Sequence, residues 1–94
     1  LGLEGARAVA EALKRNHCVE VLFISGNGIG TEGAPAIGEA LKVNCGLKKL
    51  YLQYNNFGAE GTLALLDALQ VNGSLTECRV DEYWDEVDAL CRRN

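Results

Sequence analysis

The amino-acid sequence repeats itself with a period of 28 residues. Residues 17–44 and 45–72 align without a gap and are identical at ten positions. These pairs are Leu22/Leu50, Asn27/Asn55, Gly30/Gly58, Glu32/Glu60, Gly33/Gly61, Ala36/Ala64, Ala40/Ala68, Leu41/Leu69, Val43/Val71 and Asn44/Asn72. A fixed period of this length is the signature of a solenoid, in which each repeat buries its apolar face against its neighbours.

The same frame extends over all 94 residues, which can form one domain. The predicted domain, 1–94, consists of a partial repeat (1–16), two full repeats (17–44 and 45–72) and a shortened terminal capping repeat (73–94). Because the frame starts in the middle of a repeat, we expect the domain to continue into further repeats N-terminal to Leu1.

Within each repeat, the spacing of the apolar residues changes once. Leu47, Leu50 and Leu52 alternate as in a strand with one buried side, and Val19, Leu22 and Ile24 hold the same positions one repeat earlier. After a loop with glycines, apolar residues recur with helical spacing, as Ala36, Ile37, Ala40, Leu41 and Ala64, Leu65, Ala68, Leu69. The pattern predicts parallel strands near 21–25, 49–53 and 77–80, and helices near 3–15, 31–43, 59–71 and 85–93.

Asparagine recurs at two places in the frame. Asn27 and Asn55 follow the predicted strands, where their amides can bond the turn backbone of the same and adjacent repeats. Asn16, Asn44 and Asn72 follow the predicted helices, where we expect the left-handed conformation that asparagine tolerates. The former predict an asparagine ladder, which the last repeat lacks because Tyr83 stands there.

Two further expectations concern helix ends and the terminal repeat. Thr31 is a good N-cap for the helix that follows it. In the last repeat, Trp84 and Val87 are expected to cover the open end of the core, while nearby acidic residues keep that end soluble. The alternative is a docking site at Tyr83 and Trp84.

These motifs resemble a known family. Leu47-x-x-Leu50-x-Leu52-x-x-Asn55, followed by a Gly-x-Glu-Gly loop and a long helix, is similar to the leucine-rich repeat of the ribonuclease-inhibitor class. The resemblance implies an α/β fold, namely a right-handed α/β solenoid with a short parallel sheet on its concave side and helices on its convex side. It also implies an intracellular protein-binding surface.

Composition excludes several function classes. The net charge is −4, so the chain lacks the basic stripe that neutralises phosphates, and we expect no nucleic-acid partner. No run of about 18 apolar residues is present, and the acidic balance disfavours an anionic membrane surface. The four cysteines form no CxxC pair, and Cys78 and Cys91 fall on core positions. Reduced thiols of this kind predict a cytoplasmic protein.

Catalytic and metal chemistry find little support in the sequence. The frame places His17 and Cys45 at the same repeat position, with Cys18 next to His17. The next repeat offers Gly73 there, and structural zinc sites need four protein ligands. No nucleophile is reliably placed against the single histidine. We therefore predict no enzyme activity, no metal site and no cofactor.

The strongest candidate surface comes from strand residues that alternate with the core. They are Val21, Phe23 and Ser25, then Lys49, Tyr51 and Gln53, then Glu77, Arg79 and Asp81, with Tyr54 at a strand end. An aromatic centre with a mixed-charge rim is typical of protein-binding hot spots. The sequence thus predicts a protein-interaction module that binds through the concave face of a larger scaffold or receptor.

Two other functions are compatible with the same pattern. One is a purely architectural repeat or cap within a large assembly, such as a ciliary or cytoskeletal one, in which the aromatic pair only stabilises the sheet. The other is the regulatory sensor arm of a nucleotide-binding receptor or GTPase regulator.

Overall fold

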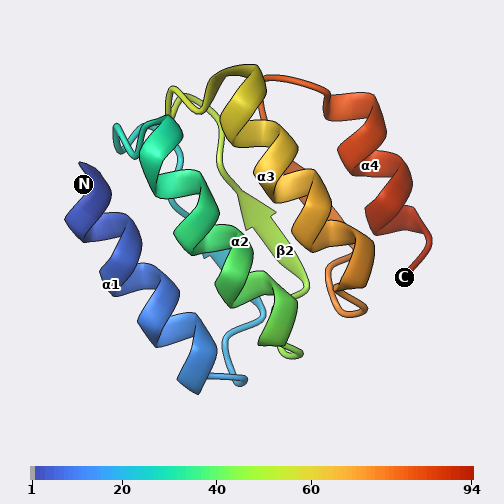
Figure 1. Cartoon of the computed structure of the whole chain (residues 1–94). Coiled ribbons are helices and arrows are strands. Elements are labelled where there is room, and N and C mark those ends of the chain that lie inside the picture. Colours follow the sequence, from blue (N-terminus) through green and yellow to red (C-terminus); the bar gives the residue numbers. More distant parts are fainter. Residues whose placement is uncertain (1) are drawn as a thin grey trace.

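The computed structural model describes residues 2–94, over which helices and strands alternate along the chain (Figure 1). Leu1, the first residue of the partial repeat, lies outside the described residues. The elements are α1 (Gly2–Arg15), β1 (Val21–Phe23), the 3-10 turn η1 (Thr31–Gly33), α2 (Ala34–Val43), β2 (Lys49–Tyr51), α3 (Gly58–Val71), β3 (Glu77–Arg79) and α4 (Trp84–Arg92).

The three strands form one parallel sheet in the order β1-β2-β3. Leu22 pairs with Leu50, and Leu50 with Cys78, so the 28-residue period is also the register of the sheet. The parallel α/β fold predicted from the period is confirmed. Each strand is shorter than expected because the chain bends after its third residue. Backbone bonding nevertheless continues, since the N–H of Ile24 donates to the carbonyl of Tyr51 at 3.1 Å.

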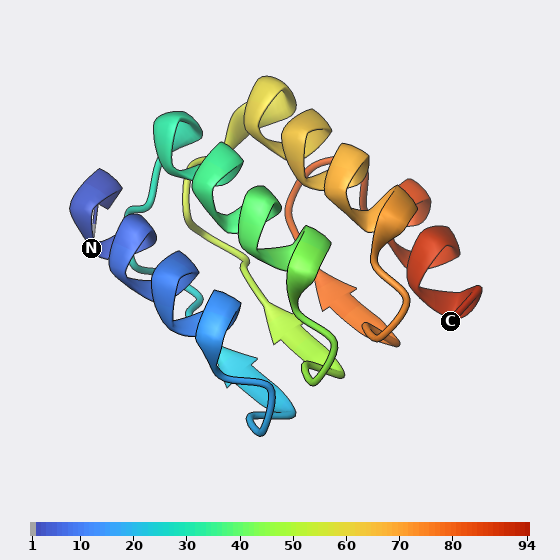
Figure 2. The ribbon, with the colours of Figure 1, turned by 60° about the horizontal axis from the view of Figure 1, so that its bottom comes forward.

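The helices and the sheet form two layers, and the helices lie over one face of the strands (Figure 2). Helix α2 packs between α1 and α3, as the order of the repeats requires. Among residues 2–94, no helix covers the other face of the sheet. The candidate surface residues of the strands belong to this open face.

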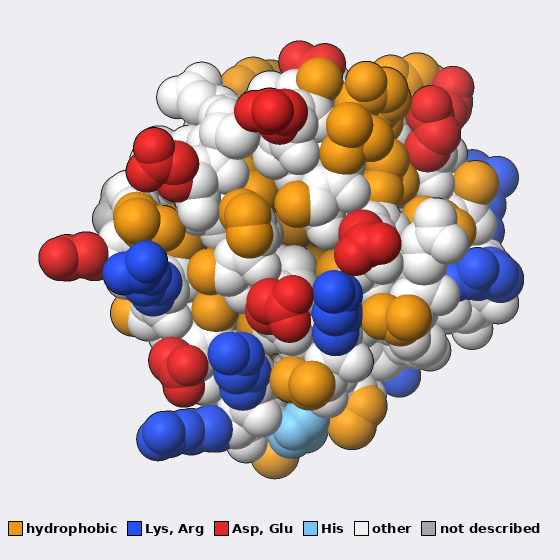
Figure 3. All heavy atoms as spheres, in the orientation of Figure 1, with side chains coloured by type: hydrophobic (Ala, Val, Ile, Leu, Met, Phe, Trp, Pro, Cys, Tyr) orange, Lys and Arg blue, Asp and Glu red, His pale blue; other side chains and the backbone are white. Residues whose placement is uncertain are grey.

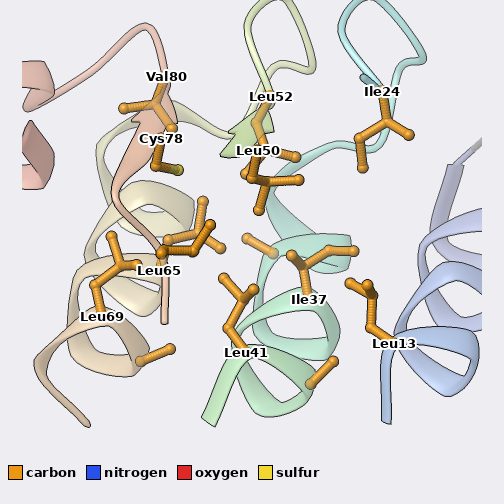
Figure 4. Packing of buried hydrophobic residues seen from close by; sticks show 14 of the residues in the cluster. Leu13, Ile24, Ile37, Leu41, Leu50, Leu52, Leu65, Leu69, Cys78 and Val80 are labelled. Atoms are coloured by element: carbon orange, nitrogen blue, oxygen red, sulfur yellow. The ribbon is translucent and has the colours of Figure 1, made fainter. Parts of the chain in front are cut away.

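Apolar side chains fill the space between the two layers (Figure 4). Leu50 and Leu52 point from the strand side toward Ile37, Leu41 and Leu65 on the helices, and all five are at most 1% exposed. The predicted helix stripe is buried in α2 and α3, apart from Ala36 and Ala64, which are half-buried.

The asparagine ladder after the strands exists as predicted, and Asn55 is its centre. The Asn55 Nδ2 donates to the carbonyls of Ile24 and Leu52, both at 2.9 Å. Its Oδ1 accepts the backbone N–H of Asn27 at 2.9 Å. Asn55 is fully buried, so one side chain satisfies backbone groups of two adjacent repeats.

The asparagines after the helices act differently from the prediction. Asn44 and Asn72 have extended backbones, with φ −75° and −71°, and are not left-handed. Their side chains form a second ladder: the Nδ2 of Asn44 donates to the carbonyls of Leu13 and Asn16, and its Oδ1 accepts the N–H of Leu47 at 2.8 Å. The bonds across repeats, rather than a local backbone preference, explain why asparagine recurs at this position.

Thr31 is also used differently from the prediction. Its hydroxyl donates to the carbonyl of Phe57 in the next repeat at 2.8 Å and makes no capping bond. Residues 31–33 form a 3-10 turn, and α2 begins only at Ala34, with Pro35 in its first positions. Proline fits there because it has no N–H to bond.

The repeated glycine pair Gly33 and Gly61 marks a close approach between repeats. A Cβ on Gly33 would lie 2.4 Å from the Cγ2 of Ile29 and 2.9 Å from the Cβ of Ala6. A Cβ on Gly61 would lie 3.3 Å from the Cβ of Ala34. Only glycine lets successive helices begin this close to each other.

We expect Gly33→Ala to lower the free energy of unfolding by about 2 kcal/mol, because the added methyl group overpacks a closed contact. Urea denaturation monitored by circular dichroism measures the change. Gly73→Ala is the matched control, since nothing lies within 4 Å of its Cβ position. Equal midpoints for the two variants would contradict the assignment of Gly33 as a contact glycine.

Within residues 2–94, the repeat formed by residues 73–94 covers one end of the core, but not with the tryptophan. Val87 is fully buried, whereas Trp84 is 62% exposed, so the prediction for Trp84 was wrong. Tyr83, in the left-handed conformation, precedes α4, and Trp84 is the first residue of that helix. Asn94 adds a further closing contact, because its Nδ2 donates to the carbonyls of Asn72 and Leu75.

The opposite end of the array is open. Val19 is 40% exposed and Leu22 is only partly buried, although both hold core positions of the repeat. They line an apolar pocket of about 170 Å³ together with Val9, Ala12, Leu13 and Asn16. No repeat within residues 2–94 covers this end, which explains the exposure of these core positions.

A candidate protein-binding surface on the open sheet face

The predicted surface residues lie in rows across the three strands. Sheet register places Val21 beside Lys49, and Lys49 beside Glu77. The next row is Phe23, Tyr51 and Arg79. A third row, Ser25, Gln53 and Asp81, follows just beyond the ends of the strands. We call the three rows together the open sheet face. The structure therefore brings together all nine strand residues that the sequence predicted.

The aromatic pair at the centre of the open sheet face is a parallel stack. The ring centroids of Phe23 and Tyr51 are 4.5 Å apart, and their planes differ by 5°. Phe23 remains 71% exposed despite this contact, while Tyr51 is half-buried. The stack therefore stabilises neighbouring strands and still leaves one aromatic side open to solvent.

Glu77 organises the polar part of the same surface. Its Oε1 accepts the hydroxyl of Tyr51 at 2.9 Å, and its Oε2 accepts the Arg79 Nη2 at 2.7 Å. Lys49 lies at the edge of ion-pair range, with its Nζ 4.0 Å from the Glu77 Oε1. The hydrogen bond from Tyr51, followed by that from Arg79, lowers the pKa of Glu77. The same bond raises the pKa of Tyr51.

The third row is polar and continues to the loop beyond β2. The Ser25 hydroxyl donates to the Gln53 Oε1 at 3.1 Å. The Oδ2 of Asp81 accepts the backbone N–H of Tyr54 at 2.7 Å, and Tyr54 itself is 75% exposed. Tyr54 has φ 61°, so this charge-assisted bond stabilises an unusual backbone conformation.

Sequence reasoning placed these charged residues as a rim but missed the bonds that the carboxylates make within the surface. Glu77 is bonded from both sides, and Asp81 is bonded by a backbone N–H. The signal that could have shown part of this was the 28-residue register, which places Lys49 beside Glu77. The bonds of Glu77 to Tyr51 and Arg79 join residues in neighbouring rows, which the register does not pair. The consequence is a preorganised surface with Phe23 as its most exposed apolar strand residue.

The geometry gives less support to a metal site or a membrane-spanning helix. Among residues 2–94, no group of three or more His, Cys, Asp or Glu side chains is arranged to hold a metal ion. Of the predicted cluster, His17 and Cys45 come together, with Nδ1 and Sγ 3.3 Å apart. Within that same part of the chain, no helix has both the length and the hydrophobicity needed to cross a membrane.

The helix side of the molecule offers a contrast to the open sheet face. Figure 3 shows that acidic and basic side chains are interspersed over the helices, with apolar side chains between them. The exposed large apolar residues of the helices include Val43, Leu63 and Val71. Ion pairs such as Lys42–Asp67, at 3.4 Å between Nζ and Oδ2, link neighbouring helices.

Comparison with known proteins agrees with the repeat geometry. The family profile described as Leucine Rich repeat matches residues 15–38 and 43–66. This chain belongs to the leucine-rich repeat family. No curated protein matches it significantly. The family is typically non-catalytic, and no catalytic family matches the chain.

A solved structure extends the comparison to most of the chain. The leucine-rich repeat chain is similar to the structure titled Leiomodin-1 Actin-Binding Site 2 (ABS2), with a TM-score of 0.79 and 31% sequence identity. The match covers 85% of this chain and 46% of that one, so this chain spans about half the length of that structure.

Proposed function

We propose that this leucine-rich repeat chain is a protein-interaction module that binds a protein partner through its open sheet face. The observation that carries the proposal is the exposed Phe23, stacked on Tyr51 within a surface whose charges are already fixed by internal bonds. Preorganised aromatic surfaces lose little side-chain entropy on binding. Phe23 and Tyr51 form the proposed centre, and the remaining residues of the three rows, with Tyr54, form the proposed contact area.

The same surface is too small to form a stable interface alone. Three parallel strands span only about 10 Å between the outer two, which gives a few hundred Å² at most. A standard stable interface needs roughly 800 Å² from each partner. The proposed site therefore extends over further repeats. We propose that such repeats stack on the open end lined by Val9, Leu13, Val19 and Leu22, because the corresponding positions one repeat later are covered.

Actin is the first partner to test, because it appears in the name of the similar leiomodin structure. An intracellular partner also fits the cysteines of this chain, which are all free thiols. The architectural function remains the second candidate. It is favoured by the fact that the Phe23–Tyr51 and Tyr51–Glu77 contacts lie within the sheet and stabilise it.

Binding of purified monomeric actin to the wild-type chain and to Phe23→Ala/Tyr51→Ala tests the proposal. If actin is the partner, we expect the double variant to weaken binding at least about thirtyfold, because even one hot-spot aromatic contributes about 2 kcal/mol or more. The matched control is Val43→Ala/Leu63→Ala, which removes exposed apolar side chains from the helix side. Circular dichroism confirms that both variants fold.

The outcomes separate the candidates. Loss of binding in the helix-side variant alone would contradict the open sheet face and favour the architectural function. If actin does not bind the wild-type chain, the same variants are compared by affinity capture and mass spectrometry. A partner that is retained equally by wild type and the Phe23→Ala/Tyr51→Ala variant would also contradict the proposal.

A further inference from the structure

One pair of reactive side chains lies outside the open sheet face. His17 and Cys45 hold the same position in adjacent repeats, in the loops that lead from helix to strand. The Cys45 Sγ lies 3.3 Å from the His17 Nδ1, and the backbone N–H of Cys45 donates to the same nitrogen at 3.1 Å. A nitrogen that accepts a peptide N–H is the unprotonated one in neutral histidine. Its single lone pair faces both the peptide N–H and the thiol, so Nδ1 acts as a base toward the thiol when the hydrogen bond from the peptide N–H is released.

The surrounding backbone holds the two residues in place. Asn44 precedes Cys45, and its Nδ2 donates to the carbonyl of Asn16, which precedes His17, at 2.9 Å. The Asn44 Oδ1 also accepts the N–H of Gly46 at 3.1 Å. The loops approach so closely that a Cβ on Gly46 would overlap the backbone of His17. The second asparagine ladder thus fixes the loop backbones that carry the imidazole and the thiol.

The thiol is also open to reagents. Cys45 and His17 are both exposed. The next repeat presents Gly73 at the same register position, so it adds no side chain there. By contrast, Cys78 and Cys91 are buried, and burial raises the pKa of the Cys78 thiol and raises that of Cys91 to about 11. Cys18 is exposed but belongs to the same loop as His17, not to the facing one.

We propose that Cys45 is a modification site, a thiol that undergoes exchange with small disulfides, with His17 as its base. The hydrogen bond from the Cys45 peptide N–H to the His17 Nδ1 opens, the Cys45 thiol gives its proton to that nitrogen, and the thiolate attacks one sulfur of the disulfide. A new S–S bond forms at Cys45 while the old S–S bond breaks, and the second sulfur leaves as a thiolate with the bonding pair. That thiolate takes a proton from His17 or from water. Cys45 is oxidised, the small disulfide is reduced, and no other oxidant is required.

Glutathione disulfide is the probe for this site. The 94-residue chain is treated with it, the reaction is stopped with acid at intervals, and peptide mass spectrometry gives the rate at each cysteine. We expect Cys45 to form the mixed disulfide roughly fivefold or more faster than Cys18, and Cys78 and Cys91 to stay unmodified in the folded chain, because reaction follows thiolate character and access. In urea-unfolded chain, where the His17 contact is lost, the difference should disappear.

His17→Asn is the decisive variant. Asparagine keeps an acceptor for the Cys45 backbone N–H but cannot take the thiol proton, so we expect the Cys45 rate to fall to that of Cys18 while the Cys18 rate stays the same. An unchanged Cys45 rate in folded His17→Asn would overturn the proposal. So would equal rates at Cys45 and Cys18 in the wild-type chain, a comparison that decides the question even if the variant does not fold.

Discussion

Leu50→Ala is expected to lower the free energy of unfolding by about 4 kcal/mol, because it leaves a cavity at the centre of the core. Leu50 is fully buried on the central strand β2, and it pairs in register with Leu22 on one side and Cys78 on the other. Urea denaturation of the wild type and the variant, monitored by circular dichroism, measures the loss. For a small repeat array this change removes much of the total stability.

Leu22→Ala is the matched control for the cavity. The residue type and the repeat position are the same, but Leu22 lies on the edge strand and borders the open pocket. We expect a cost of about 1 kcal/mol, since the solvated side chain contributes less burial. If both substitutions cost the same, the stability of this chain would not depend on stacking around the central repeat.

Asn55→Ala is expected to cost about 3 kcal/mol, because it leaves several buried backbone groups without partners. The Asn55 side chain bonds the carbonyls of Ile24 and Leu52 and the N–H groups of Asn27 and Ile29. The methyl group of alanine replaces none of these bonds, and the site is closed to water. The midpoint of urea unfolding is again the measurement.

The control for Asn55 is its neighbour, changed to glycine. Asn56 has φ 59°, so Asn56→Ala would add backbone strain of its own, whereas glycine accepts this conformation. Asn56 is exposed, and we expect Asn56→Gly to change the free energy of unfolding by less than about 0.5 kcal/mol. A loss of similar size for Asn55→Ala and Asn56→Gly would contradict the ladder as a stabilising feature.

The recurring asparagines show what the repeat pattern can and cannot predict. The position of Asn55 after a strand led to the ladder that the structure confirms. Asn44 and Asn72 recur just as regularly, but the local rule for helix ends gave the wrong conformation. The period was informative in both cases. The partner of each side chain lies one repeat away, where a rule based on neighbours in sequence has no information.

The predictions for residues 84–94 were incomplete for a related reason. Trp84 is large and apolar, which favoured a buried cap, yet it begins α4 and is exposed, whereas Val87 is buried. Asn94 escaped notice although the frame, shortened by six residues in the last repeat, places it at the position of Asn44 and Asn72. Its Nδ2 donates to the carbonyl of Asn72 as that of Asn72 donates to the carbonyl of Asn44. Within the described residues, the repeat of residues 73–94 has a neighbouring repeat on one side only, so it lacks part of the packing that makes positions between two repeats regular.

The sequence alone determined the fold class, the register and the residues of the open sheet face, because a fixed period makes every repeat position meet its equivalent in the next repeat. Only the tertiary structure decided how those residues use their bonding capacity. Glu77 bonds Tyr51 on the neighbouring strand and Arg79 on its own strand, through distances and directions that spacing cannot supply. Hydrogen bonds depend on tenths of an ångström and on direction, whereas burial of apolar surface depends mainly on the pattern.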